Sequence, residues 1–184
     1  MFKSHTSLVG LLLIVGILLM ACSGRTLTAS PIPELEKYEG RPLHIAVIGE
    51  LPSVREQQIQ FSTIQFTDLL DRKLELYDAV FITKEHLNEA SEDQYADVYM
   101  EAPIPFFFID ASKSYHSFIE KDLSYEENLD LKEISNHYII GLLATEEAEY
   151  TYWYFGLYDD IVSDQTIKGT FSQVFVTIEK QMNF

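Results

Sequence analysis

The chain has 184 residues, of which 13 are Lys or Arg and 29 are Asp or Glu, so its formal net charge is −16 at pH 7. So acidic a chain repels phosphate backbones, which excludes nucleic acid as an expected partner. The apolar content of 47% excludes a largely disordered chain. The single cysteine, Cys22, excludes internal disulfides and thiolate metal clusters.

The first 22 residues have the layout of a secretory signal: Lys3 and His5 precede an apolar run from Leu8 to Ala21. This run is shorter than the roughly 20 apolar residues that span a bilayer comfortably. It ends in Leu-Met-Ala-Cys at positions 19–22, which resembles the lipobox of bacterial lipoproteins, although Met20 stands where a small residue is usual. The resemblance covers residues 1–22. It implies cleavage after Ala21 and lipidation of the Cys22 sulfur.

The resemblance divides the chain into three parts. Residues 1–21 are the expected signal peptide, and residues 22–42, rich in Ser, Thr, Gly and Pro, are the expected lipidated tether. Residues 43–184 are the expected single domain. Removal of Lys3 with the signal leaves a net charge of −17, so this domain would be held outside the membrane by the lipid on Cys22 and not by a basic patch.

The first half of the domain alternates apolar strands with helical segments. The expected elements are a strand at 43–49, a strand at 59–66 with an irregularity at Ser62-Thr63, and a helix capped by Thr67. A strand at 77–83, a helix from Glu85 to about Met100, a strand at 104–110 and a short helix at 112–121 follow.

The second half has a different pattern. The strand-like runs 137–143 and 150–155 predict an antiparallel hairpin. After the cap Ser163-Asp164, apolar residues recur at helical spacing, despite Gly169, which costs about 1 kcal/mol relative to alanine. The chain is therefore expected to form an α/β three-layer sandwich. Its sheet would be mostly parallel and flavodoxin-like or Rossmann-like, with the hairpin at one edge and an amphipathic C-terminal helix.

Motifs of common catalytic and cofactor sites are absent from the sequence. There is no phosphate-binding loop, no dinucleotide fingerprint after the first strand and no nucleophile elbow. The histidines lack metal-ligand spacing, and no calcium loop occurs. No cofactor and no metal are expected, and catalysis is less expected than binding.

The carboxyl ends of the strands are the expected place for a ligand in an open α/β sheet. Glu50, Lys84, Asp110 and Ser112 follow the predicted strands and form the candidate ligand site. Asp110 is also expected as a helix cap for the segment after it, and this interpretation is favoured over a functional carboxylate.

The aromatic run of the hairpin offers a candidate interface. Alternation places Tyr150, Tyr152 and Tyr154 on one face and Trp153 and Phe155 on the other. Exposed phenol rings would bind a partner, whereas covered ones would be core.

These observations favour a membrane-anchored surface lipoprotein whose noncatalytic domain binds a protein or small-molecule partner. The alternatives are an envelope enzyme with its site at the carboxyl ends of the strands, and a structural or assembly factor that uses the aromatic hairpin.

Overall fold

The structure, a computed structural model, describes residues 32–131, 136–145 and 149–182. Ala21 and Cys22 lie outside these residues. The described chain is an α/β fold, as predicted, built on one six-stranded mixed sheet of order β2-β1-β3-β4-β5-β6. The strands are Leu43–Ile48 (β1), Ile59–Thr63 (β2), Ala79–Ile82 (β3), Phe106–Ile109 (β4), His137–Ala144 (β5) and Tyr150–Gly156 (β6).

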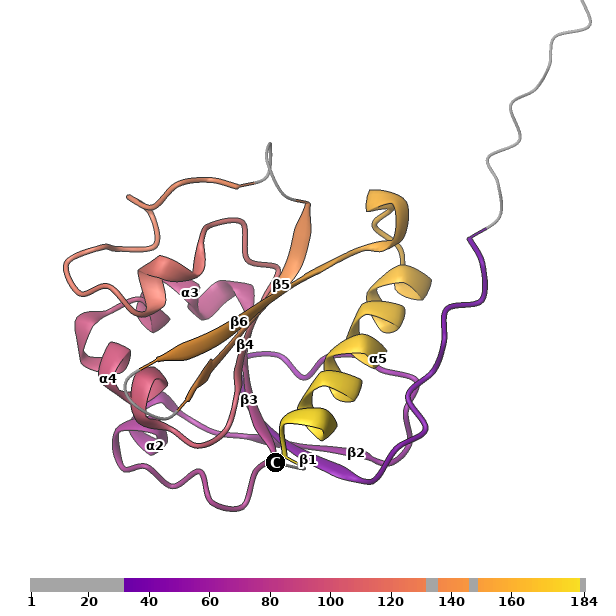
Figure 1. The fold of residues 1–184 in the computed structure, drawn as a ribbon, viewed down its shortest axis with the longest axis horizontal. Helices are drawn as coiled ribbons and strands as arrows, with labels where there is room; N and C mark the ends of the chain where they lie inside the picture. Colours follow the sequence, from indigo (N-terminus) through magenta and orange to yellow (C-terminus); the bar gives the residue numbers. More distant parts are fainter. Residues whose placement is uncertain (1–31, 132–135, 146–148, 183–184) are drawn as a thin grey trace, which may run out of the picture. The chain divides into compact units, whose positions relative to one another are not determined.

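The first four strands pair in parallel. β5 then pairs antiparallel with β4, and β6 pairs antiparallel with β5. The helices are Phe66–Leu70 (α2), Leu87–Ala90 (α3), Asp93–Glu101 (α4) and Asp164–Gln181 (α5), with 3₁₀ turns at Lys84–His86 (η1), Tyr115–Phe118 (η2) and Tyr158–Asp160 (η4). In Figure 1, α5 lies on one side of the sheet and α2, α3 and α4 lie on the other. Among the described residues, no helix is both long and apolar enough to cross a membrane.

Alternation along the buried strands creates two cores, one on each face of the sheet. Ala46, Val80 and Phe106 face the core under α2, α3 and α4, whereas Val47, Phe81 and Phe107 face the core under α5. The predicted α5 begins where expected, because the Ser163 hydroxyl accepts a hydrogen bond from the Thr166 backbone N–H.

The predicted second strand and the cap of the helix after it are wrong in detail. The second strand is regular at Ser62 and Thr63, which pair with β1, and it ends there. The chain then turns directly into α2, whose N-cap is Gln65 and not Thr67, because the Asp68 carboxylate accepts the backbone N–H of Gln65.

The helix expected from Glu85 to about Met100 is instead divided into η1, α3 and α4. The break comes after α3, where the Ser91 hydroxyl donates to the Asn88 carbonyl at 2.8 Å. A serine hydroxyl that competes for backbone groups in this way disfavours helix continuation.

The ten residues between β1 and β2 contain no helix. They cross the α5 side of the sheet as a loop, from which Val54 packs against that core and Glu56 is buried. A short non-helical connection therefore takes the place of a crossover helix.

Residues 32–42, which we call the strap, continue the packed domain before Leu43. Tyr38, expected in the tether, is only 2% exposed, and its ring centroid lies 5.9 Å from that of Phe175. Gln165 at the start of α5 donates to the Pro33 carbonyl, and Glu179 near its end accepts the Arg41 N–H. The strap thus runs along α5 from its beginning to its end (Figure 1).

Candidate functional site

The carboxyl ends of β1, β3 and β4 meet at one edge of the sheet because the three strands are parallel. Glu50 follows β1, Lys84 follows β3 and Asp110 follows β4. The ends of β1 and β3 lie very close together: Gly49 has φ +113°, and a Cβ there would overlap the Thr83 hydroxyl. Glycine is therefore required where the chain turns toward the edge.

Three of the four residues predicted for a ligand site line one cavity at this edge. Its volume is about 350 Å³. Besides Glu50, Lys84 and Asp110, its walls include Thr83, Glu85, Ile109, Tyr138, Asp164, Ile167 and Phe171. We call this space the carboxyl-edge cavity.

Ser112, the fourth predicted residue, is not part of that cavity lining. Asp110 has φ +52°, so the chain turns sharply after β4. The backbone N–H of Ser112 then donates to the Tyr125 hydroxyl at 2.8 Å, and its carbonyl accepts from Leu131. Ser112 therefore holds the loop beyond the cavity together.

Lys84 and Asp110, both in the cavity lining, form an ion pair with 2.6 Å between Nζ and Oδ2. The Asp110 carboxylate raises the pKa of Lys84, first through this hydrogen bond and then through its charge. Both side chains are well exposed, at 58% and 39%, so the pair contributes little to stability. Lys84 remains protonated at neutral pH and serves as a cation already matched with one anion.

Two other residues of the cavity have shifted pKa values. The pKa of Glu85 is lowered, first by a hydrogen bond from its own backbone N–H and then by one from Thr83. The pKa of Tyr138 is raised by burial, and then by the charges of Asp110 and Glu85, so its phenol stays neutral and can donate a hydrogen bond.

Glu50 differs from these residues. Its side chain is exposed, and within the described part of the chain it forms no hydrogen bond or ion pair. It is therefore the carboxylate of the cavity most available to a ligand. Ile109 and Phe171, both buried, offer an apolar surface in the same cavity.

The start of α5 adds negative charge to the wall. A bare helix N-terminus attracts anions, but the Ser163 side chain caps this one and Asp164 occupies its first turn. Asp164 also pairs with Lys168 at 2.9 Å. The cavity lining therefore has four carboxylates and one ammonium group, a balance that suits a cation.

Sequence reasoning missed Tyr138 and Asp164 as cavity residues. Tyr138 comes from the antiparallel β5 and Asp164 from the returning helix α5, so neither follows one of the parallel strands. The capping pattern Ser163-Asp164 located the helix start but not its neighbours. In the described residues, no three His, Cys, Asp or Glu side chains converge as ligands for one metal ion.

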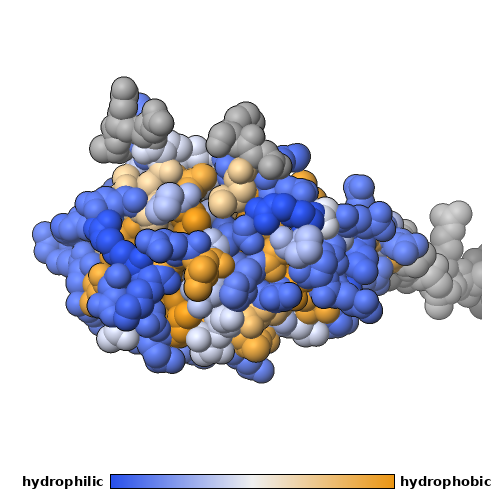
Figure 2. Space-filling model, turned by 90° about the horizontal axis from the view of Figure 1, so that it is seen from below, coloured by the Kyte–Doolittle hydropathy of each residue, from blue (hydrophilic) through white to orange (hydrophobic). Residues whose placement is uncertain are grey.

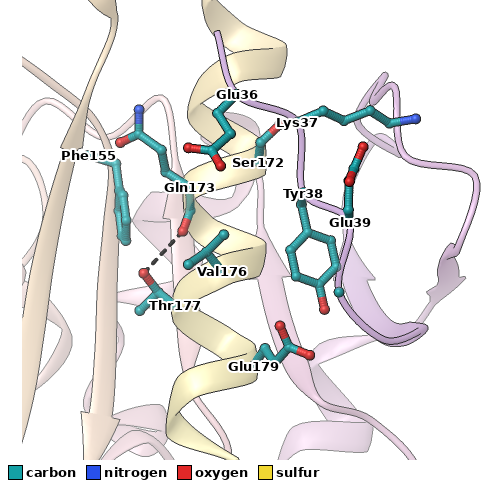
Figure 3. A pocket seen from close by; sticks show the side chains of 11 residues that line it. Glu36, Lys37, Tyr38, Glu39, Phe155, Ser172, Gln173, Val176, Thr177 and Glu179 are labelled. Carbon is teal, nitrogen blue, oxygen red and sulfur yellow. Dashed lines mark hydrogen bonds between the residues drawn. The ribbon is translucent and has the colours of Figure 1, made fainter.

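A larger cavity, of about 720 Å³, lies between the strap and α5. Figure 3 shows Tyr38 pointing toward Glu179, with Gln173, Val176 and Thr177 on the neighbouring helix face. Two of its polar groups are bonded within the fold: the Tyr38 hydroxyl donates to the Arg41 carbonyl, and the Thr177 hydroxyl donates to the Gln173 carbonyl. This space lies where the strap packs against α5, and we do not assign ligand binding to it despite its size.

A third cavity, of about 370 Å³, lies near the amino ends of β3 and β4. It is lined by Leu74, Tyr77, Val98, Ala102 and Ile104. Figure 2 looks from below onto the molecule and shows orange apolar areas between hydrophilic residues on this side. Of the three charged residues in its lining, Arg72 and Glu101 pair with each other, and Glu75 is exposed. This cavity offers apolar contact without the converging polar groups that would orient a ligand.

The predicted aromatic interface is partly exposed. Tyr152 is 46% exposed and Tyr154 is 37% exposed, whereas Phe155 on the other face is buried. The Tyr152 ring stacks on Tyr115, with centroids 4.4 Å apart. Tyr150 is half-buried against the core, so the run combines core and surface residues.

Comparison with known proteins supplies no relative from which residue roles could be transferred. No protein-family model, no curated protein and no solved structure matches this chain. Roles are therefore argued from geometry and chemistry alone.

Proposed function

We propose that this chain is a membrane-anchored lipoprotein whose α/β domain binds, without catalysis, a small ligand that carries a cationic group. The observation that carries this proposal is the convergence of Glu50, Lys84 and Asp110 in the carboxyl-edge cavity. The expected anchor is a lipid on Cys22, which follows the apolar run and the residues resembling a lipobox.

Charge is the first argument for the ligand class. Lys84 is matched by Asp110, and Asp164 by Lys168, which leaves Glu50 and Glu85 as excess negative charge at the site. Glu85 already accepts hydrogen bonds within its own turn. An ammonium or guanidinium group bound at Glu50 would neutralise the remaining carboxylate through a charge-assisted hydrogen bond.

The shape of the lining suggests the rest of the ligand. Ile167 and Phe171 provide apolar contact beside the charged groups, and the neutral Tyr138 hydroxyl is a donor. An amine with an apolar body and an acceptor atom fits this combination. Because the described carboxylates do not converge on one point, an organic cation fits better than a metal ion.

The ionisation of the site argues for binding over catalysis. A catalytic lysine acting as base or nucleophile needs a depressed pKa, whereas Asp110 raises that of Lys84. The phenol of Tyr138 also has a raised pKa and would not serve as a base at neutral pH.

The topology supports the choice of edge. The order β2-β1-β3-β4 with parallel pairing is that of a flavodoxin-like sheet, and we propose that the domain is a variant of that fold with β5 and β6 as an edge hairpin. In such sheets ligands bind beyond the carboxyl ends of the strands.

Thermal unfolding of the full chain in detergent, with and without small compounds, tests the proposal. A panel of alkyl and aryl amines is compared with carboxylates, phosphates and neutral sugars. A bound amine at about 100 times its Kd should stabilise the fold by about 2.7 kcal/mol, a shift of several degrees.

Three variants test the site itself. Glu50→Gln should weaken amine binding about tenfold, since it removes the charge-assisted hydrogen bond. Asp110→Asn keeps a residue tolerant of the left-handed backbone while removing the charge that is matched to Lys84. Glu120→Gln, an exposed carboxylate outside all the cavities described above, is the control and should bind amines as the parent chain does. Stabilisation by anions but not amines, or an unchanged Kd in Glu50→Gln, would contradict the proposal.

A further inference from the structure

The edge strand β6, Tyr150–Gly156, lacks two usual protections of a sheet edge, charged side chains and proline, and the register shift in its pairing with β5 lies at its far end, between His137 and Ile139. Among the described strands it pairs only with β5, and in the view of Figure 1 it crosses in front of the other strands. Its sequence, YTYWYFG, contains no charged residue and no proline. Natural edge strands are commonly blocked by such residues, because an open edge pairs readily with another chain.

The hydrogen-bonding pattern shows which backbone groups face outward. The Thr145 N–H donates to the Glu149 carbonyl at 2.8 Å, so this pair is hydrogen-bonded across the hairpin. Bonded and non-bonded pairs alternate along antiparallel strands. By the register of β5 and β6, the N–H and C=O groups of Tyr152 and Tyr154 point away from β5.

The side chains leave this edge open. Thr151, Tyr152, Tyr154 and Gly156 are all exposed. Apart from the sheet itself, no backbone hydrogen bond joins Tyr152 or Tyr154 to another described residue. Tyr115 stacks on the Tyr152 ring and lies 6.3 Å from Tyr154, which supports both rings from below.

We propose that β6 is a docking site for an extended, basic peptide segment of a partner protein, which adds to the sheet as a seventh strand. Backbone groups of Tyr152 and Tyr154 would bind the segment, and its alternate side chains would lie beside the two rings. This site is separate from the carboxyl-edge cavity and does not depend on the function proposed for it.

Charge identifies the occupant. Glu149 lies at the beginning of β6, and the exposed Asp159 and Asp160 follow its end. Antiparallel pairing of two copies through β6 would bring Glu149 of one copy toward Asp159 and Asp160 of the other, and like charges oppose such pairing. A strand with Lys or Arg at each end would be attracted at both ends.

Fluorescence anisotropy of a labelled peptide, measured with the full chain in detergent, tests this inference. The probe has a lysine at each end and alternating threonine and valine between them. Two matched peptides serve as controls: one is N-methylated at every amide between the lysines, so that neither of its edges can pair, and the other has glutamates at its ends. The lysine-ended peptide should bind, and each control should bind at least about tenfold more weakly, because it loses backbone hydrogen bonds or gains repulsion.

Two variants of Tyr152 distinguish the contribution of its backbone N–H to binding from that of its ring. Tyr152→Pro removes the outward N–H without breaking the ladder to β5 and should abolish binding. Tyr152→Val keeps the N–H but loses the ring, and should bind within about threefold of the parent chain if backbone pairing dominates. Equal binding of methylated and unmethylated peptides, or no binding of the lysine-ended probe, would overturn the inference. A Tyr152-dependent dimer would assign the edge to a second copy and overturn it as well.

Discussion

Leu35 of the strap and Gly169 of α5 fit against each other so closely that a Cβ on Gly169 would lie 3.0 Å from the Leu35 Cβ and would overlap its Cδ1. Glycine in a helix interior costs about 1 kcal/mol relative to alanine. Here it provides the space in which the strap crosses the first half of α5. Gly169, which disfavoured a helix in the sequence, is therefore the point at which the strap contacts α5.

This relationship predicts a change of sign in a double-mutant cycle. Gly169→Ala in the parent chain should lower the free energy of unfolding by about 1–2 kcal/mol, because the methyl group displaces Leu35. In a Leu35→Ala background the same change should raise it by up to about 1 kcal/mol, since only the helix preference remains. Urea denaturation of the four chains measures both values. Equal effects in the two backgrounds would show that the contact is not energetically significant.

Glu56 joins the strap to the rest of the domain. It is 3% exposed, and its carboxylate accepts hydrogen bonds from the Tyr38 N–H, the Ser172 hydroxyl at 2.6 Å and the Arg55 N–H. Glu56→Gln places an amide NH₂ among these donors and should lower the free energy of unfolding by about 2 kcal/mol.

The matched control for that change is Glu39→Gln, an exposed carboxylate in the same strap. It should alter stability by less than about 0.5 kcal/mol. The denaturant midpoints of Glu56→Gln and Glu39→Gln measure the difference. Similar midpoints would mean that the hydrogen bonds of Glu56 do not stabilise the strap on the domain.

Tyr38 makes stability depend on alkaline pH. Burial, and then the negative charge of Glu179, raise the pKa of its phenol to about 12. A group whose pKa is higher in the folded state stabilises the fold fully below its unfolded pKa of about 10, and this contribution is lost as the pH rises through the folded pKa. The free energy of unfolding should therefore fall between about pH 10 and 12.

Tyr38→Phe isolates this contribution. The variant should be about 1 kcal/mol less stable at pH 8, because the Arg41 carbonyl loses its donor. Between about pH 10 and 12 its stability should decline less than that of the parent chain, since the ionisable group is gone. Parallel stability curves across this range would assign the alkaline loss to other residues.

The anchor is tested at Cys22. Cys22→Ala removes the sulfur that would accept the lipid, so the cells should release the domain or accumulate an unprocessed precursor. Fractionation followed by mass spectrometry of the N-terminus distinguishes these products from the parent chain. A fully processed, membrane-bound variant would show that the resemblance to a lipobox is misleading.

The parts of the fold that follow local patterns were predictable. The apolar strand runs and the spacing of Phe171, Val174, Phe175 and Ile178 act within one element, so α5 and the α/β class could be read directly. The shared position of Glu50, Lys84 and Asp110 followed from the geometry of parallel strands.

The parts that depend on distant contacts were not predictable. Tyr38 meets Phe175 and Leu35 meets Gly169 across more than a hundred positions, and the strap has no apolar periodicity of its own. Ser112 was placed wrongly because its position depends on the left-handed turn at Asp110. Aspartate tolerates this backbone conformation, but its presence in a sequence does not predict it.

The strap would connect the proposed lipid on Cys22 to the end of α5 that borders the carboxyl-edge cavity. The strap begins beside Gln165, next to the Asp164 wall of the carboxyl-edge cavity, and Cys22 lies ten positions before Ile32. Ten residues reach at most about 35 Å. A lipid on Cys22 would therefore hold Ile32 within about 35 Å of the bilayer. The domain would then meet its ligand in the solution beside the membrane more often than in the bulk.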